Sequence, residues 1–213
     1  DLVDGNAKIA SIKVTGDAAG LAANLSDLAA IGHKLTSIDQ SDADTNPLAL
    51  TGDAYDANRG TLAKIAGGYT AELSAVAASK AAVYAADVHV GSLHVADTGA
   101  NLSSSWDALA TLGSKLADFT QSDSAALQLT AQQWSAEHSL ADKAAGTLAV
   151  DVSKATVADA ATLASDDAVQ QVNIVDTAAA VSAALGDLSG NTKLGQVELS
   201  NPTTALTMSA DTF

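Results

Sequence analysis

The densest acidic stretch of the chain, from Asp39 to Pro47, holds the residues best suited to bind a cation. Asp39, Asp42 and Asp44 place three carboxylates close together, and Ca²⁺ prefers oxygen ligands of this kind. The spacing is not that of an EF-hand, because Gly and Glu are missing from the sixth and twelfth loop positions. Two interpretations stay open: a Ca²⁺ site formed by these aspartates, or an acidic solvated loop. We favour the loop, because the related segment at 120–126 keeps only Asp123 and loses the partners of Asp39 and Asp44.

Two of the four histidines, His89 and His94, are close enough in the sequence to suggest a pair of metal ligands. They are five positions apart, so on one continuous strand their side chains face opposite sides. Only a turn at Gly91 and Ser92 would bring the two rings together. We therefore expect partly exposed strand residues here.

No residue pattern identifies a reaction. The chain has no Cys, which excludes thiol catalysis, disulfides and thiolate metal sites. It contains no G-x-S-x-G elbow, no P-loop and no G-x-G-x-x-G turn. Any two of the 25 acidic residues could form a glycosidase pair, but no spacing singles out two of them. We predict no catalytic and no cofactor-binding residue.

The charge balance excludes several classes of partner. The formal net charge is −15, and only 10 residues are Lys or Arg. Nucleic acid binding requires a basic face, so we expect no nucleic acid partner. No apolar run reaches about 18 residues, so we also expect no membrane insertion.

One nine-residue phrase recurs along the chain at a fixed interval. It reads ALQLTAQQW at 126–134, and related phrases lie 79 positions before it, at 47–55, and 79 positions after it, at 205–213. Upstream of the phrase, 12–42 and 93–123 match at eleven of 31 positions. A repeat at such a period indicates an array of similar units. The predicted units are 1–92, 93–171 and a partial third copy at 172–213, which together form one continuous solenoid.

The residue pattern within a copy alternates between strands and helices. A short alternating apolar segment, such as 92–95, predicts a strand. Asp97 and Thr98 can cap the helix that follows, in which Leu102, Trp106 and Leu109 share one face. Further segments predict strands at 115–119, 126–130 and 147–152, and helices at 131–144 and 156–167. We therefore expect an α/β solenoid of strand-helix turns with parallel strands, similar to leucine-rich repeats. The alternative is a set of tandem small α/β domains.

Tyr55, Trp134 and Phe213 occupy the same position in the three copies. An exposed row of aromatic rings would stack on sugars or on partner side chains. We favour a buried anchor for a helix, because this helix face is expected to turn inward. Trp106 stands where the other copies have Leu, which also predicts a core position.

The order of these motifs resembles the repeats of large secreted bacterial proteins. It is carried by VADTGANLSSSWDALATLGSKLADFTQSDSAALQLT (95–130) and IVDTAAAVSAALGDLSGNTKL (174–194). Such proteins are often exported by type I secretion and act as adhesins, surface-layer or matrix components, or repeat regions attached to enzymes. The Ca²⁺-binding nonapeptide G-G-x-G-x-D-x-U-x of that secretion class does not occur in this sequence.

The resemblance implies a non-catalytic structural or adhesive repeat module of a larger extracellular bacterial protein. Its expected partners are a cell-surface or matrix component, or neighbouring repeats. The alternative function is an enzyme or enzyme-associated domain that acts on a polysaccharide. Because the chain starts without Met or a signal peptide, we expect it to be a piece of a longer protein.

Overall fold

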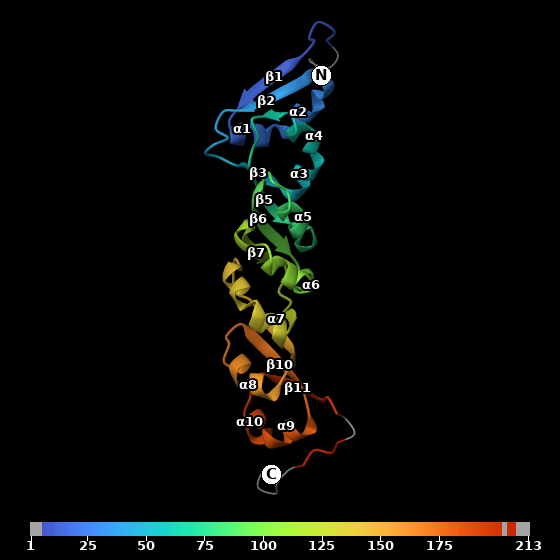
Figure 1. Cartoon of the computed structure of the whole chain (residues 1–213), viewed down its shortest axis with the longest axis vertical. Coiled ribbons are helices and arrows are strands. Elements are labelled where there is room, and N and C mark those ends of the chain that lie inside the picture. The colour runs from blue at the N-terminus through green and yellow to red at the C-terminus, as the bar shows by residue number, and fades with distance from the viewer. Residues whose placement is uncertain (1–5, 202–203, 208–213) are drawn as a thin grey trace. The chain divides into compact units, whose positions relative to one another are not determined.

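The computed structural model describes residues 6–201 and 204–207. It is an α/β structure with three sheets, and each strand pairing described in these sheets is parallel (Figure 1). The predicted α/β class and parallel pairing are therefore confirmed. The chain divides into a first unit, Asp1–Ala96 with Leu112–Phe119, and a second unit, Asp97–Thr111 with Thr120–Phe213.

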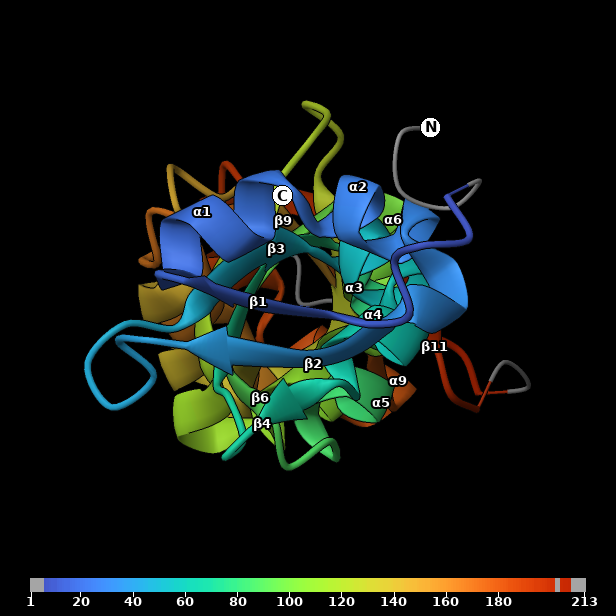
Figure 2. The ribbon, with the colours of Figure 1, turned by 90° about the horizontal axis from the view of Figure 1, so that it is seen from above.

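The first unit contains two parallel sheets. One has the strand order β1-β2-β4 and the other β3-β5-β6-β7, in which the last residues of β6 and β7 belong to the second unit. Figure 2 shows β1 and β2 side by side. The strands are β1 (Ile12–Gly16), β2 (Leu35–Gln40), β3 (Leu48–Thr51), β4 (Ile65–Ala66), β5 (Ala71–Val76), β6 (Val90–Asp97) and β7 (Leu116–Gln121).

The helices of the first unit are short, and two of their breaks occur at Asn. The side-chain amides of Asn24 and Asn58 donate to the backbone oxygens of Gly20 and Ala54, at 2.8 and 2.9 Å. Such local bonds compete with continued helix formation. The helices are α1 (Ala18–Ala23), α2 (Leu25–Ala30), α3 (Gly52–Ala57), α4 (Arg59–Leu62) and α5 (Ala81–Ala85), with 3-10 turns η1 (Gly32–Lys34), η2 (Ala78–Lys80) and η3 (Gly113–Lys115).

The second unit contains one parallel sheet of order β11-β10-β9-β8. Its strands are β8 (Leu127–Thr130), β9 (Val150–Ala155), β10 (Val169–Asp176) and β11 (Leu194–Leu199). Its helices are α6 (Gly99–Ala110), α7 (Ala131–Ala136), α8 (Val157–Ala164), α9 (Ala178–Ala183) and α10 (Leu185–Ser189), with the 3-10 helix η4 (His138–Lys143).

The predicted helix 131–144 is shorter than expected. It ends at Ala136, because the backbone of Glu137 leaves the helical region at φ −117° and ψ 28°. The remaining turns are 3-10 and form η4. The predicted cap at Thr98 is confirmed, because its side chain accepts a hydrogen bond from a backbone N–H of α6. Thr177 caps α9 in the same way.

The core consists of inward-facing strand residues and a few large aromatic rings. In β8, for example, Leu127 and Leu129 are buried and Gln128 is exposed. Trp106 and Trp134 are 0% and 1% exposed, and their ring centroids lie 6.1 Å apart in the second unit. An aromatic pair of this kind stabilises the fold by more than its buried apolar area alone would. The prediction that these positions are core is confirmed, whereas Phe213 lies outside the described residues.

The 79-residue period extends to details of the backbone. β3 begins at Leu48 and β8 at Leu127, 79 positions later. Ala75 in β5 and Lys154 in β9 are also 79 positions apart, and both adopt the left-handed conformation, with φ 50° and 54°. Few residues other than Gly do so. Beside them the strand register shifts, which is typical of β-bulges.

Candidate functional site

The most elaborate polar cluster of the first unit surrounds Tyr55 on α3. The Tyr55 hydroxyl donates to Oδ2 of Asp87 at 2.8 Å. Arg59, the first residue of α4 after the break at Asn58, lies over the Tyr55 ring at 4.7 Å from its centroid. Its Nη1 donates to the same Asp87 oxygen at 3.1 Å, so one carboxylate joins the hydroxyl and the guanidinium.

Tyr69 and His89 form one wall beside this cluster. Their rings stack at a centroid distance of 4.4 Å and an interplanar angle of 7°, and His89 Nδ1 lies 3.2 Å from the Tyr69 carbonyl oxygen. The Tyr69 hydroxyl donates to the Tyr55 oxygen at 3.5 Å. A hollow of about 220 Å³ lies between these groups and an apolar floor; its lining residues are Tyr55, Arg59, Leu62, Ala63, Ile65, Tyr69, Asp87 and His89.

The protonation states in the cluster are set by burial and hydrogen bonding. Burial works against the ionised Asp87 carboxylate, but hydrogen bonds from the His89 N–H, Tyr55 and Arg59 hold its pKa below the ordinary value. Burial, assisted by hydrogen bonding to Tyr69 and Asp87, raises the pKa of the Tyr55 hydroxyl. The cluster therefore combines an ionised Asp, a charged Arg and a neutral phenol.

The second unit has a simpler version of this cluster. Trp134 Nε1 donates to Asp166 Oδ2 at 2.9 Å, and His138 Nε2 lies 3.1 Å from the same oxygen. The His138 ring contacts the Trp134 ring edge to face at 4.7 Å. No sequence pattern singled out Asp87 or Asp166, each of which lies 32 positions after its aromatic partner. Asp87 and Asp166 are 79 positions apart, as Tyr55 and Trp134 are, and this shared spacing was the sequence signal that could have identified them.

The three predicted calcium ligands have separate environments. Asp39 is an exposed residue of β2, and Asp44 is exposed in the turn that follows. Asp42 Oδ1 accepts a hydrogen bond from the backbone N–H of Ala18 at 2.8 Å, at the start of α1, and Oδ2 accepts from Asn46 at 2.9 Å. The Asp42 carboxylate thus serves as a helix cap.

Desolvation of Asp42 is outweighed by hydrogen bonds from the Ala18 N–H and from Asn46 and Gln40, which lower its pKa. Among residues 6–201 and 204–207, no group of three or more His, Asp or Glu side chains is arranged to hold a metal ion. The Ca²⁺ site stays a prediction. Of its three carboxylates only that of Asp42 is partly buried, and it accepts hydrogen bonds from Ala18 and Asn46.

The two neighbouring histidines lie in different environments. His89 is in the turn before β6 and stacks on Tyr69. His94, in β6, lies between two carboxylates: its Nε2 is 2.7 Å from Glu72 on β5, and its Nδ1 is 2.9 Å from Asp118 on β7. Burial opposes the charged ring, but Asp118 and Glu72 raise the pKa of His94. The two ring nitrogens thus face different carboxylates. Glu72, His94 and Asp118 form a row of ion pairs across the neighbouring strands β5, β6 and β7.

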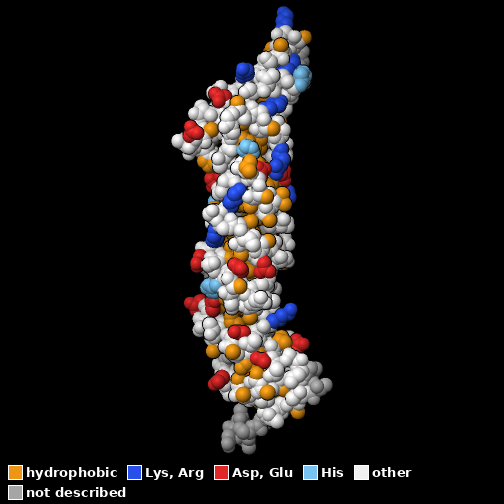
Figure 3. All heavy atoms as spheres, viewed as in Figure 1, with side chains coloured by type: hydrophobic (Ala, Val, Ile, Leu, Met, Phe, Trp, Pro, Cys, Tyr) orange, Lys and Arg blue, Asp and Glu red, His pale blue; other side chains and the backbone are white. Residues whose placement is uncertain are grey.

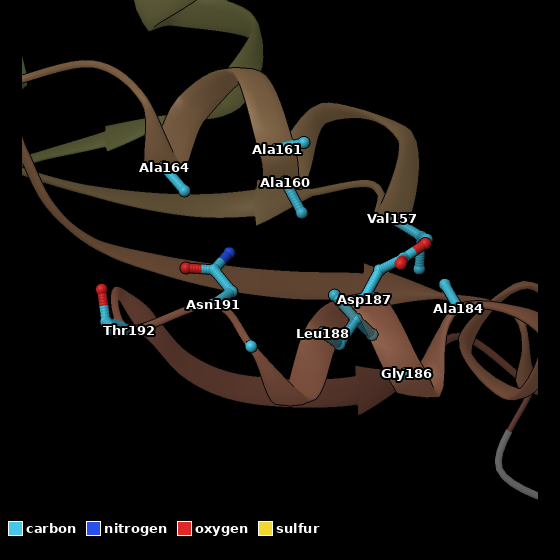
Figure 4. Close-up of a pocket in the computed structure, with 11 residues that line it drawn as sticks. Val157, Ala160, Ala161, Ala164, Ala184, Gly186, Asp187, Leu188, Asn191 and Thr192 are labelled. Atoms are coloured by element: carbon cyan, nitrogen blue, oxygen red, sulfur yellow. The ribbon is translucent and has the colours of Figure 1, made fainter. Parts of the chain in front are cut away.

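The second unit has a larger pocket of about 600 Å³ between α8 and α10. Figure 4 shows Ala160, Ala161 and Ala164 on α8 facing this space, with Asp187 and Leu188 opposite. Small side chains and Gly186 leave the two helices apart. The only charged side chain that lines the pocket is Asp187, so the pocket offers little chemistry.

On the face shown in Figure 3, Lys and Arg side chains stand apart from one another. In the described part of the chain, no helix has the length and apolar character needed to span a bilayer. No known protein family, curated protein or solved structure matches this chain.

Proposed function

We propose that the chain is a non-catalytic repeat module of a larger extracellular bacterial protein. In this proposal its strand-helix turns stack as a continuous solenoid, which extends the protein and presents a surface to a cell-surface or matrix component, or to neighbouring repeats. The extracellular location is supported by the absence of Cys, the acidic composition and the resemblance of the repeat to secreted bacterial proteins.

The observation that carries the proposal is a helix cap that recurs in all three copies. A side-chain oxygen after the second strand of the copy accepts a hydrogen bond from the first backbone N–H of the copy's opening helix. The three bonds are Ala18 to Asp42 at 2.8 Å, Gly99 to Asp123 at 2.9 Å and Ala178 to Asn201 at 2.8 Å. Each bond joins segments 23 or 24 positions apart, about one strand-helix turn.

A second recurrent contact uses the lysines of the repeated Lys-Leu pair. Their ammonium groups donate to backbone oxygens 27 or 28 positions earlier: Lys34 to Asn6, Lys115 to Asp87 and Lys193 to Asp166, at 3.0, 3.1 and 2.6 Å. Asp87 and Asp166 follow the helices α5 and α8, whereas Asn6 precedes β1. Carbonyl groups near a helix end are otherwise unsatisfied. The most regularly repeated polar side chains thus hold turns together, as a stacking module requires.

The alternative function, an enzyme or enzyme-associated domain that acts on a polysaccharide, is less well supported, because the repeated aromatic residues are buried. Tyr55 and Trp134 are each 1% exposed, so their faces are not available as a row of sugar-stacking platforms. Their polar hydrogens are already donated to Asp87 and Asp166.

Paired spin labels test continuous stacking against tandem domains. Because the chain has no Cys, labels attach only at introduced positions. Ala82→Cys in the first unit and Ala136→Cys in the second unit both change exposed helix residues. A continuous solenoid predicts one narrow distance distribution between them, as narrow as that of the control pair Ala30→Cys and Ala82→Cys within the first unit. A broad distribution for the first pair only would overturn the solenoid.

Insertion of one further period tests the extending role. A second copy of 93–171 placed between the labels should increase the label distance by a fixed step and leave the distribution narrow. A broadened distribution, or loss of cooperative unfolding, would contradict a module that works by adding turns.

A further inference from the structure

The hollow beside Tyr55 is a place where the first copy departs from the second in chemistry. The Asp at its rim is retained as Asp166, but three polar or aromatic lining residues are not. Arg59, Tyr69 and His89 correspond to His138, Leu148 and Ala168, each 79 positions later. Stacking of the copies alone does not require different side chains at these three positions. A binding site, by contrast, is expected to differ locally from the repeat pattern, with polar residues gathered in one hollow.

Two groups at the hollow retain unused hydrogen-bonding capacity. Arg59 uses Nε for Asp56 and Nη1 for Asp87, and its Nη2 bonds to no residue in the described part of the chain. His89 uses Nδ1, and its Nε2 likewise has no partner among residues 6–201 and 204–207. The Arg59 side chain is 48% exposed and His89 is partly exposed, and both residues line the hollow.

The charges at the hollow favour a neutral ligand. Arg59 lies against two carboxylates, Asp56 at 3.2 Å and Asp87 at 3.1 Å. Of the two carboxylates, Asp87 lines the hollow together with Arg59, so a ligand anion would meet the Asp87 carboxylate and a ligand cation would meet the guanidinium. Hydroxyl groups can instead accept from Arg59 and donate to Asp87 without any added charge.

The size and lining of the hollow narrow the ligand further. A cavity of about 150 Å³ holds a benzene ring, so a hollow of about 220 Å³ suits one ring that carries hydroxyl substituents. Leu62, Ala63 and Ile65 offer an apolar floor for its C–H face. We propose that this hollow in the first unit binds one neutral pyranose ring, with Arg59, Asp87 and His89 contacting its hydroxyls.

NMR titration of the full chain tests the inference. The ¹⁵N-labelled protein is titrated separately with D-glucose and D-galactose, and with the charged sugars D-glucuronate and D-glucosamine. A small ligand with few contacts predicts a Kd on the order of 1 mM. We expect saturable shifts for at least one neutral sugar at residues 55–69 and 87–89, and weaker binding of the corresponding charged sugar.

Exchanges with the second copy's own residues supply the variants. Arg59→His and His89→Ala should each weaken binding at least about tenfold. His138→Ala, at the position corresponding to Arg59, is the matched control and should leave the Kd unchanged. Arg59 is 48% exposed and is not itself a core residue, so we expect its exchange to keep the fold. Arg59→Lys keeps the charge but loses the planar fork and should also weaken binding.

Absence of saturable shifts, unchanged affinity in Arg59→His, or shifts centred on the second unit would each overturn the inference. Preferential binding of a charged sugar would overturn the neutral ligand. The inference does not rest on the stacked arrangement: a broad label distance would remove the solenoid and leave sugar binding intact, and a failed titration would leave the solenoid intact.

Discussion

Tyr55 in the first unit and Trp134 in the second are the same position of one repeat, yet their surroundings differ. Both rings are buried, and both donate their polar hydrogen to an Asp 32 residues later. Around Tyr55 the neighbours are Arg, Tyr and His, and a hollow is left. Around Trp134 they are His, Leu and Ala. The repeat thus preserves the bond that holds the aromatic residue, while the groups at its rim vary.

The largest expected effect on stability comes from removing the two buried rings. Trp134→Ala and Tyr55→Ala should each lower the free energy of unfolding by about 3–5 kcal/mol, because each leaves a large cavity in the core. Urea unfolding followed by far-UV circular dichroism measures the loss. Val83→Ala, at a side chain 68% exposed, is the control and should change little. A small loss in either ring variant would show that the two positions are not equivalent anchors.

The second test removes the acceptor of the buried donor. Asp166→Ala leaves the indole N–H of Trp134 without its acceptor, which should cost about 1–3 kcal/mol of unfolding free energy. Asp166→Asn retains one side-chain oxygen and should cost less. Urea unfolding measures both variants. Equal losses in the two would mean that the carboxylate charge, rather than the hydrogen bond, stabilises this position.

The third test compares the caps of the helices that carry the two rings. Thr130 and the Gln133 side chain cap each other's backbone N–H groups in a capping box, whereas Thr51 caps only Ala54. Thr130→Ala should cost about 1 kcal/mol, and Thr51→Ala should cost less. Thermal unfolding of the pair decides this. A larger effect at Thr51 would contradict the stabilising role of the box.

The smallest expected effect concerns His94, whose position is occupied by Asn173 in the next copy. The folded protein raises the pKa of His94 above 6.5. Its stabilising contribution is therefore fully present below pH 6.5 and is lost as the pH rises through the folded pKa. The stability difference between wild type and His94→Asn should be greater at about pH 5.5 than at about pH 8.5, by at most about 1 kcal/mol after solvent screening. A difference that grows with pH would contradict the assigned charges of the row.

Sequence reasoning succeeded where the physics is local. Thr98 and Thr177 were predictable as caps because a cap depends on the next three residues, and the strands followed from alternation. It was incomplete where a partner lies a turn away. The Asp42 carboxylate was singled out as a Ca²⁺ ligand, and that stays a prediction; its role as a cap was missed because its donor, the Ala18 N–H, is 24 positions distant. Asn24 and Asn58 broke helices that apolar spacing alone would have continued.

The two kinds of recurrent contact, the helix caps and the lysine-to-backbone bonds, differ in whether they cross a boundary between copies. The three recurrent helix caps each have both partners inside one copy, as Asp123 and Gly99 do, whereas the first N–H of α8, on Val157, donates to Asp176 of the next copy at 3.0 Å. The two lysine contacts that cross a boundary, Lys115 to Asp87 and Lys193 to Asp166, use a backbone oxygen, which every residue carries. Recombination that deletes or duplicates a whole period of the gene would therefore keep the three recurrent caps and the backbone acceptors of the lysines. For these contacts, the number of copies can change in a single genetic event without a change in the residues that form them.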